Sequence, residues 1–187
     1  MADTRSALGR RHVSGVRALA LTLAIVSLSV LSVGCSNVKE LNYAPVRMDP
    51  GPARQKTKAV SSRLLEMTGI KGRVTEPGPS VSRCDEYGDD LFSLTHPWSV
   101  YALTNEQVDT GMANLRKALG ENGWKITKDG KANTPAQDPE IWAENETEQF
   151  AMNVTARKDG GNQTMLLFSV VSRCYRAASS SALDGEY

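Results

Sequence analysis

The stretch TNEQVDTGMANLRKALGENGW, residues 104–124, decides the fold, because it holds the best-defined helix of the chain. Thr104 and Gln107, three residues apart, form a capping-box pattern, in which each side chain satisfies a backbone N–H left open at a helix start. Apolar residues then recur every three or four positions, which predicts a core-facing stripe; they are Val108, Met112, Leu115 and Leu119. Gly123 suits the position just past the helix end, and Trp124 begins the next strand.

Segments on both sides of this helix have the apolar patterns of strands and of a second helix. Residues 98–103 and 149–157 alternate between apolar and polar, as expected for strands with one buried face, and a short strand is expected near residues 91–94. Residues 163–172 are apolar on both faces, which predicts a central strand. A helix over residues 52–68 has an apolar stripe formed by Val60, Leu64 and Met67. The order predicts an α+β fold: an antiparallel sheet of four to six strands with two helices packed on one face.

The first 34 residues have the pattern of a bacterial export signal. Four arginines precede an uncharged segment over residues 18–33, which ends in small residues before Cys35. A basic head, a short apolar middle and a small-residue end are typical of a cleavable secretory signal. The alternative is an uncleaved membrane helix, but these residues at ~1.5 Å each reach about 24 Å, short of the ~30 Å hydrocarbon core. The pair Arg10-Arg11 leaves open whether export uses the general or the twin-arginine route.

The end of this segment, SVGCS at residues 32–36, resembles the signal peptides of bacterial lipoproteins, in which the cysteine after the cleavage site carries the lipid. Ser32 stands where that pattern has a leucine, and Leu31 lies one position earlier. The resemblance implies that Cys35 is acylated and that the protein is exported and anchored by lipid to the outer face of the cell membrane. Stable attachment implies more than one acyl chain, because a single chain binds membranes only marginally.

The part of the chain over residues 52–175 resembles small lipoproteins of actinobacterial type. The shared features are a strand–helix–Gly–Trp–strand core, here Trp98 through Trp124, and a cysteine that closes the last strand, here Cys174. The resemblance implies no particular activity, since these lipoproteins have none assigned.

The composition after the signal segment restricts the partners. Removal of residues 1–34 takes away four of the 22 basic residues and one of the 21 acidic ones, so the rest is slightly acidic. No basic run remains that would neutralise phosphates, which argues against nucleic acid. The expected partners are the membrane, through acylated Cys35, and an envelope protein or a small ligand.

Two cysteines remain once Cys35 is used for lipid. Cys84 and Cys174 form an even pair in an oxidising compartment, where disulfides persist, so we expect a bridge between them. It would close a loop of about 90 residues, worth ~4 kcal/mol in the chain-entropy model. The alternative is two unrelated buried thiols.

These observations divide the chain into four parts. Residues 1–34 are the signal peptide, and residues 35–51 are a tether with prolines and no apolar period. Residues 52–175 are the α+β domain. Residues 176–187, rich in Ala and Ser, are expected to be a disordered tail.

His96 is the only histidine after the signal segment. A lone histidine cannot build a multi-histidine metal site, and any hydrolase triad would have to use it, with Ser93, Thr95 or Ser99 as nucleophile. The interpretation that we favour is structural: the imidazole caps backbone groups or packs on an indole. No phosphate loop, nucleophile elbow or dinucleotide fingerprint is present, so we expect no cofactor.

Two further groups of residues each have a functional and a structural interpretation. The aromatic residues Trp98, Tyr101, Trp124 and Trp142 could line a ligand groove, although core packing is the alternative that we favour. Acidic clusters over residues 85–90 and 140–148 could bind a cation or act as paired catalytic carboxylates. Solvated carboxylates around turns are the more ordinary interpretation, and we expect no metal site.

The sequence therefore predicts a lipid-anchored extracytoplasmic lipoprotein that acts as a non-catalytic binding or interaction module with an unidentified ligand. The alternative is a small cell-envelope hydrolase that uses His96.

Replacing Cys35 by serine is expected to abolish lipid attachment, because only the thiol of that residue receives the acyl group. In a bacterial host, the wild-type protein should incorporate labelled palmitate and partition into detergent, and Cys35→Ser should do neither. Cys84→Ser is the control and should keep the label. Equal labelling of Cys35→Ser would show that Cys35 is not the acylated residue.

Overall fold

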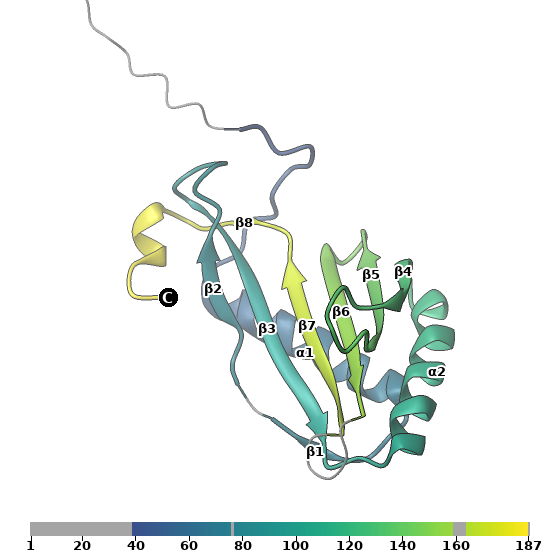
Figure 1. Ribbon diagram of the computed structural model, residues 1–187. Helices are drawn as coiled ribbons and strands as arrows, with labels where there is room; N and C mark the ends of the chain where they lie inside the picture. The colour runs from purple at the N-terminus through teal and green to yellow at the C-terminus, as the bar shows by residue number, and fades with distance from the viewer. Residues whose placement is uncertain (1–38, 76, 159–163, 187) are drawn as a thin grey trace, which may run out of the picture. The chain divides into compact units, whose positions relative to one another are not determined.

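The computed structural model describes residues 39–75, 77–158 and 164–186, and residues 36–187 form a compact unit of their own. The fold is α+β, with two helices packed against an antiparallel sheet (Figure 1). The elements, in chain order, are α1 (Pro50–Thr68), β1 (Arg73–Val74), β2 (Ser80–Arg83), β3 (Leu91–Tyr101), α2 (Asn105–Glu121), β4 (Lys125–Lys131), β5 (Pro139–Asn145), β6 (Phe150–Arg157), β7 (Met165–Ser172), β8 (Tyr175–Arg176) and a 3-10 helix (Ser180–Leu183). The predicted fold class is confirmed.

The sheet is built around β3, its longest strand among the described residues. The strand order is β1-β3-β7-β6-β5-β4, with β2 and β8 also paired to β3. β7 lies between β3 and β6, which confirms the prediction of a central strand from its apolar pattern. The sequence predicts no strand at β1 or β2, which form because the outer edge of β3 offers free backbone groups there.

β3 corrects one prediction, since the two strands expected at residues 91–94 and 98–103 are one continuous strand. It runs through Pro97, which pairs with Ser169 of β7. On the other edge of β3, β2 pairs only as far as Thr95 and β1 begins at Val100. Pro97 falls in the gap between them, where the missing N–H costs least.

The second helix has the ends that the sequence predicts. The Thr104 hydroxyl accepts a hydrogen bond from the Gln107 N–H at 3.1 Å, and the Gln107 side chain accepts one from the Thr104 N–H at 2.8 Å. Gly123 has φ 77°, a left-handed conformation that glycine adopts readily. The predicted apolar stripe of α2 is buried.

The main core lies between both helices and one face of the sheet. α1 contributes Val60 and Leu64, and β6 contributes its alternate residues, as predicted. Trp98 of β3 stacks on its register partner Phe168 of β7, with ring centroids 4.1 Å apart. Trp124 is also buried in this core. Because all these side chains come from one face of each strand, α1 and α2 both cover that face of the sheet.

The C-terminal segment differs from the disordered tail that the sequence predicts. β8 pairs with the start of β3, and the 3-10 helix follows it. Leu183 is fully buried in a second apolar cluster with Ala53 of α1 and Phe92 of β3. Glu186 forms an ion pair with Arg54. A single leucine in an Ala/Ser-rich stretch therefore orders the tail, because α1 and β3 provide an apolar site for it.

The described part of the predicted tether, residues 39–49, lies along the domain. The backbone of Arg47 forms an isolated parallel β-bridge with Arg176 of β8. The Tyr43 hydroxyl accepts a hydrogen bond from the Cys174 N–H at 2.8 Å. α1 begins at Pro50, two residues earlier than expected.

The predicted disulfide is confirmed. Cys84, just after β2, is bonded to Cys174, between β7 and β8, across a sequence separation of 90 residues. The bond joins the two sides of β3, since β2 and β8 both pair with that strand.

Replacing Cys84 and Cys174 together by alanine is expected to lower the free energy of unfolding by about 4 kcal/mol, because the long loop is no longer closed in the unfolded chain. Urea unfolding of residues 36–187 would measure the loss. Thr104→Ala removes only a helix cap and should lower the free energy of unfolding by about 1 kcal/mol, so it is the reference for a small effect. An unchanged midpoint for the cysteine variant would contradict a stabilising bridge.

Candidate functional site

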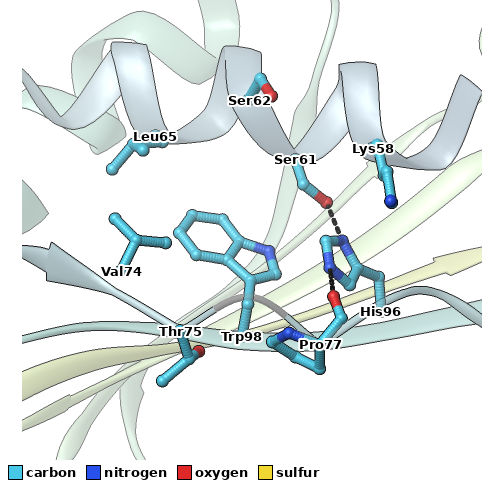
Figure 2. Close-up of a pocket in the computed structure, with 9 residues that line it drawn as sticks. All are labelled: Lys58, Ser61, Ser62, Leu65, Val74, Thr75, Pro77, His96 and Trp98. Carbon is cyan, nitrogen blue, oxygen red and sulfur yellow. Dashed lines mark hydrogen bonds between the residues drawn. The ribbon is translucent and has the colours of Figure 1, made fainter. Parts of the chain in front are cut away.

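A pocket of about 300 Å³ lies between α1, β3 and the segment around β1 (Figure 2). α1 presents four residues spaced as one helix face, and β3 presents two residues of the same strand face. The lining residues are Lys58, Ser61, Ser62, Leu65, Val74, Thr75, Pro77, His96 and Trp98. Apolar walls with a few polar groups are typical of small-molecule sites.

His96 connects two walls of the pocket. Its Nε2 lies 2.8 Å from the Pro77 carbonyl oxygen, and its Nδ1 lies 2.8 Å from the Ser61 hydroxyl (Figure 2). A carbonyl only accepts, so Nε2 carries the hydrogen and donates to Pro77. In the neutral ring, Nδ1 then accepts from the Ser61 hydroxyl. The imidazole thus fastens the segment at Pro77 to α1.

The environment of His96 keeps the ring neutral. Burial lowers its pKa from the usual 6.5, and the positive charge of Lys58 lowers it further. The hydrogen bond to Pro77 has a smaller, opposite effect. At neutral pH the Nδ1 lone pair is therefore available to the Ser61 hydroxyl.

Trp98 carries a polar group that nothing satisfies. Its ring is buried and stacked on Phe168, but the indole Nε1 has no hydrogen-bond partner among the described residues. Figure 2 shows this nitrogen on the ring edge that faces Ser61 and His96. A buried donor without an acceptor costs about 1–3 kcal/mol.

Lys58 brings a positive charge to the pocket rim. The side chain is exposed, and no ion pair or hydrogen bond links it to another described residue. The part of the lining that the structure describes contains no carboxylate.

The nucleophiles considered with His96 from the sequence lie away from it. Ser93, Thr95 and Ser99 are separated from His96 by odd numbers of positions along β3, so they belong to the opposite strand face. The hydroxyl that contacts the imidazole is that of Ser61, 35 residues earlier, which sequence analysis missed. Its only signal was a polar residue next to Val60 in the core-facing stripe of α1.

The four aromatic residues predicted as a possible groove do not come together. Trp98 lines the pocket, whereas Trp124 is part of the core. Tyr101 lies at the end of β3. The Arg73 guanidinium carbon lies over its ring, 5.3 Å from the centroid of that ring. Trp142 lies on the other face of the sheet, 46% exposed, and lines a second pocket of about 640 Å³.

Some carboxylates of each acidic cluster form ion pairs. Glu86 pairs with Lys39 at 2.6 Å, and Asp90 pairs with Arg176. In the second cluster Glu140 pairs with Lys128. Within the described ranges, no group of three or more His, Cys, Asp or Glu side chains is placed to hold a metal ion.

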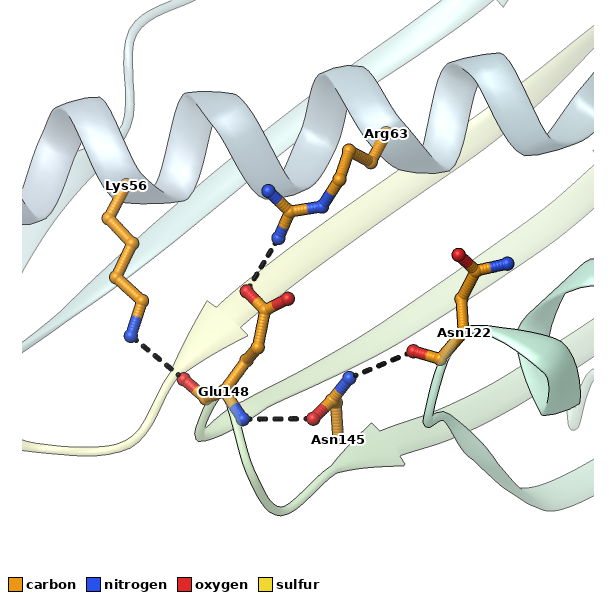
Figure 3. A network of polar contacts seen from close by, with 5 residues as sticks. All are labelled: Lys56, Arg63, Asn122, Asn145 and Glu148. Atoms are coloured by element: carbon orange, nitrogen blue, oxygen red, sulfur yellow. Dashed lines mark hydrogen bonds and ion pairs between the residues drawn. The ribbon is translucent and has the colours of Figure 1, made fainter.

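Glu148, also in the second cluster, joins three elements (Figure 3). Its carboxylate accepts from Arg63 of α1 at 2.5 Å, and its carbonyl accepts from Lys56 at 3.1 Å. Its N–H donates to the Asn145 side chain, which in turn donates to the Asn122 carbonyl at the end of α2. This network holds α1, α2 and the β5–β6 turn together, which is a structural role.

The predicted lipid attachment site, Cys35, and the export segment lie outside the described residues. No helix in the part of the chain that the structure describes is long and apolar enough to cross a membrane.

No protein family, curated protein or solved structure matches this chain. Its function is therefore inferred from its own residues.

Replacing His96 by glutamine is expected to flatten the dependence of stability on pH between 7.5 and 5.5. His96 has a lowered pKa in the folded state, so below about pH 6.5 the unfolded chain binds a proton that the folded protein does not. Wild-type stability should fall as the pH drops through this range. The lowered carboxyl pKa values of Asp129 and Glu140 act only at lower pH. Urea unfolding of residues 36–187 at both pH values would measure this loss of stability. An equal loss in His96→Gln would show that His96 does not cause it.

Proposed function

We propose that the protein is a lipid-anchored extracytoplasmic binding module that takes a small ligand into the pocket between α1 and β3. The observation that carries the proposal is the pocket itself, about 300 Å³ in volume, with apolar walls from Leu65, Val74 and Trp98 and polar side chains from Lys58 and Ser62. Small-molecule sites combine apolar walls with a few polar groups in this way. A bound small molecule would cover the apolar walls and contact the polar groups.

The proposed location rests on the sequence and agrees with the disulfide. The basic head, apolar middle and SVGCS end of residues 1–36 support export and acylation at Cys35. The Cys84–Cys174 bond is of a kind that persists in oxidising compartments. The described tether residues bring the chain to the domain at the end where β8 and Cys174 lie.

The arrangement of His96 favours binding over catalysis. Both ring nitrogens are engaged, one with Pro77 and one with Ser61, so the ring fixes the pocket wall. Ser61 is itself 5% exposed. Pro77 takes the place where a catalytic carboxylate would stand, and a carbonyl cannot stabilise an imidazolium by charge.

A second candidate function, hydrolysis of an ester or amide, is favoured by the 2.8 Å contact of Ser61 with a neutral His96. In that reaction Ser61 Oγ would attack the carbonyl carbon while Nδ1 of His96 takes its proton. The imidazolium would pass the proton to the leaving group, and water would then release the acyl group from Ser61.

Ligands of the pocket are expected to move one indole N–H resonance of residues 36–187 in particular. The chain has three tryptophans, so Trp124 and Trp142 serve as internal controls for Trp98. In a fragment screen followed by ¹H–¹⁵N NMR, binders should shift the Trp98 indole signal most. Ser62→Phe, which fills the pocket from an exposed helix position, should suppress these shifts. A screen in which no fragment moves Trp98 would contradict the binding proposal.

Residues 36–187 can also be used to test the second candidate function, hydrolysis, against binding. A binding module should not react with a fluorophosphonate probe at Ser61. Labelling that Ser61→Ala abolishes, together with ester turnover lost in His96→Gln, would replace binding by hydrolysis as the function.

A further inference from the structure

A second pocket, which we call the outer-sheet pocket, lies on the face of the sheet opposite α1. In Figure 1 α1 lies behind the sheet. The neighbouring strands β4, β5, β6 and β7 each contribute side chains to the pocket, and the β4–β5 loop supplies the rest of its lining. The volume is about 640 Å³, within the ~300–1,000 Å³ of ordinary ligand sites. This pocket is therefore separate from the α1–β3 pocket.

Trp142 of β5 brings an exposed aromatic ring to the outer-sheet pocket. It is 46% exposed, the largest fraction for a large apolar side chain among the described residues. The other two tryptophans, Trp98 and Trp124, are only 5% and 6% exposed. Covering aromatic surface of this size is favourable, and a ring that no other side chain covers is available to a ligand.

Polar groups hold this ring in place. Glu140, two residues before Trp142 on the same strand face, is 6% exposed and forms an ion pair with Lys128. The hydrogen bond from Lys128 lowers the pKa of the Glu140 carboxyl against the effect of burial, and hydrogen bonding from Trp142 lowers it further. The indole N–H is thus turned toward the carboxylate, whose other oxygen accepts from Asn153 at 3.4 Å. A ring fixed before binding loses less conformational freedom when a ligand stacks on it.

Hydrogen-bonding groups of both kinds surround the ring. The Asn133 amide in the β4–β5 loop can both donate and accept, and the Asp138 carboxylate accepts. Thr155 of β6 lies opposite Glu140 in the strand register. Its hydroxyl donates to the Asn153 side chain at 3.4 Å, so its oxygen can still accept a hydrogen bond from a ligand. A ligand with hydroxyl groups, which also donate and accept, would match this set.

The charges at the outer-sheet pocket have both signs. Among the described lining residues, Lys128 and Arg157 are cationic, and Asp138 and Glu140 are anionic. Lys128 and Glu140 already form an ion pair with each other. A strongly charged ligand would meet a group of its own sign there, so the lining suits a neutral polar molecule.

From these observations we infer that the outer-sheet pocket binds a neutral saccharide, with one sugar ring stacked on Trp142 and hydroxyls hydrogen-bonded to Asn133 and Thr155. A pyranose ring has a face of C–H groups and an edge of hydroxyls. The C–H groups carry partial positive charge and the face of an indole is negative, which favours stacking. The inference concerns a separate site and does not rest on binding in the α1–β3 pocket.

A proline-rich peptide fits this pocket less well. Proline-rich segments dock in grooves lined with aromatic residues, whereas the described lining of the outer-sheet pocket has one aromatic ring among mostly polar and small side chains. Such a peptide is therefore used in the test as the competing ligand.

The test follows the indole N–H signals of residues 36–187 by ¹H–¹⁵N NMR while saccharides are added. The probes are maltotriose, cellotriose, mannotriose and triacetylchitotriose, each at about 10 mM, enough to detect a Kd in the mM range. At least one should shift Trp142, whereas the buried Trp98 and Trp124 should not move. Sorbitol has hydroxyls but no rigid ring with an apolar face, so it should leave Trp142 unchanged.

Variants assign the binding to the residues, with affinity measured by saturation transfer to the sugar protons. Trp142→Ala should weaken binding at least about tenfold, because it removes the stacking face. Thr155→Val keeps the shape but removes the hydroxyl, and should weaken binding about three- to tenfold. Val171→Ala, at an exposed apolar residue of the same sheet face outside the pocket lining, is the matched control and should change nothing. A urea midpoint for each variant would verify that it is folded.

The salt dependence of binding provides a further measurement. The affinity for a neutral saccharide should stay the same when NaCl is raised from about 0.05 M to 0.5 M, because no net charge is screened. A large loss of affinity over this range would contradict a neutral ligand.

Three other outcomes would overturn the inference. The first is that none of the four trisaccharides shifts Trp142, or that sorbitol shifts it equally. The second is that hexaproline shifts Trp142 while the saccharides do not, which would make the pocket a peptide site. The third is undiminished binding in folded Trp142→Ala, which would place the saccharide elsewhere. Binding in the α1–β3 pocket is reported by Trp98, so its test is independent of all three.

Discussion

The pairing of β3 with β7 is the constraint on which the rest of the structure depends. Seven residue pairs join the two strands, and their register places Trp98 directly opposite Phe168. Since strand side chains alternate, this register puts His96 and Trp98 on the face that α1 covers. A shift by one residue would turn both side chains away from α1 and would place Pro97 and Ser99 on the α1 face instead. The pocket exists because this register is held.

Polar groups inside the helix–sheet layer position the elements around β3. His96 and Ser61 tie α1 to the strand and to Pro77, and the Glu148 network ties α1 to the β5–β6 turn and to the end of α2. The Asn114 side chain donates to the Thr68 carbonyl, which joins the two helices. Buried polar groups are costly unless satisfied, so the buried Ser61–His96 hydrogen bond in particular defines how α1 docks on the apolar face of the sheet. Among the described residues, the buried side-chain atoms Trp98 Nε1, Gln149 Oε1 and the Tyr175 hydroxyl oxygen have no such partner.

Binding and hydrolysis would use the same residues of the pocket but require different roles of His96. For binding, His96 only fixes the position of the pocket wall, through its hydrogen bonds with Ser61 and Pro77. For hydrolysis, His96 must take a proton from Ser61 and keep the resulting charge, next to Lys58 and without a carboxylate at Nε2. The nearby cation opposes that charge, which is why the geometry favours a site that holds a molecule over one that converts it.

Local patterns in the sequence by themselves determined the helix over residues 104–122, the alternation of β6 and the central place of β7, because each depends on neighbouring residues and a fixed period. The Cys84–Cys174 pair followed from counting, since only two cysteines remain after Cys35. The tertiary structure alone decided that Ser61 meets His96, that Leu183 orders the tail, and that Trp142 is exposed while Trp98 lines a pocket. These features depend on residues tens of positions apart. Strand register and the docking of α1 decide them, and neither produces a periodic pattern in the sequence.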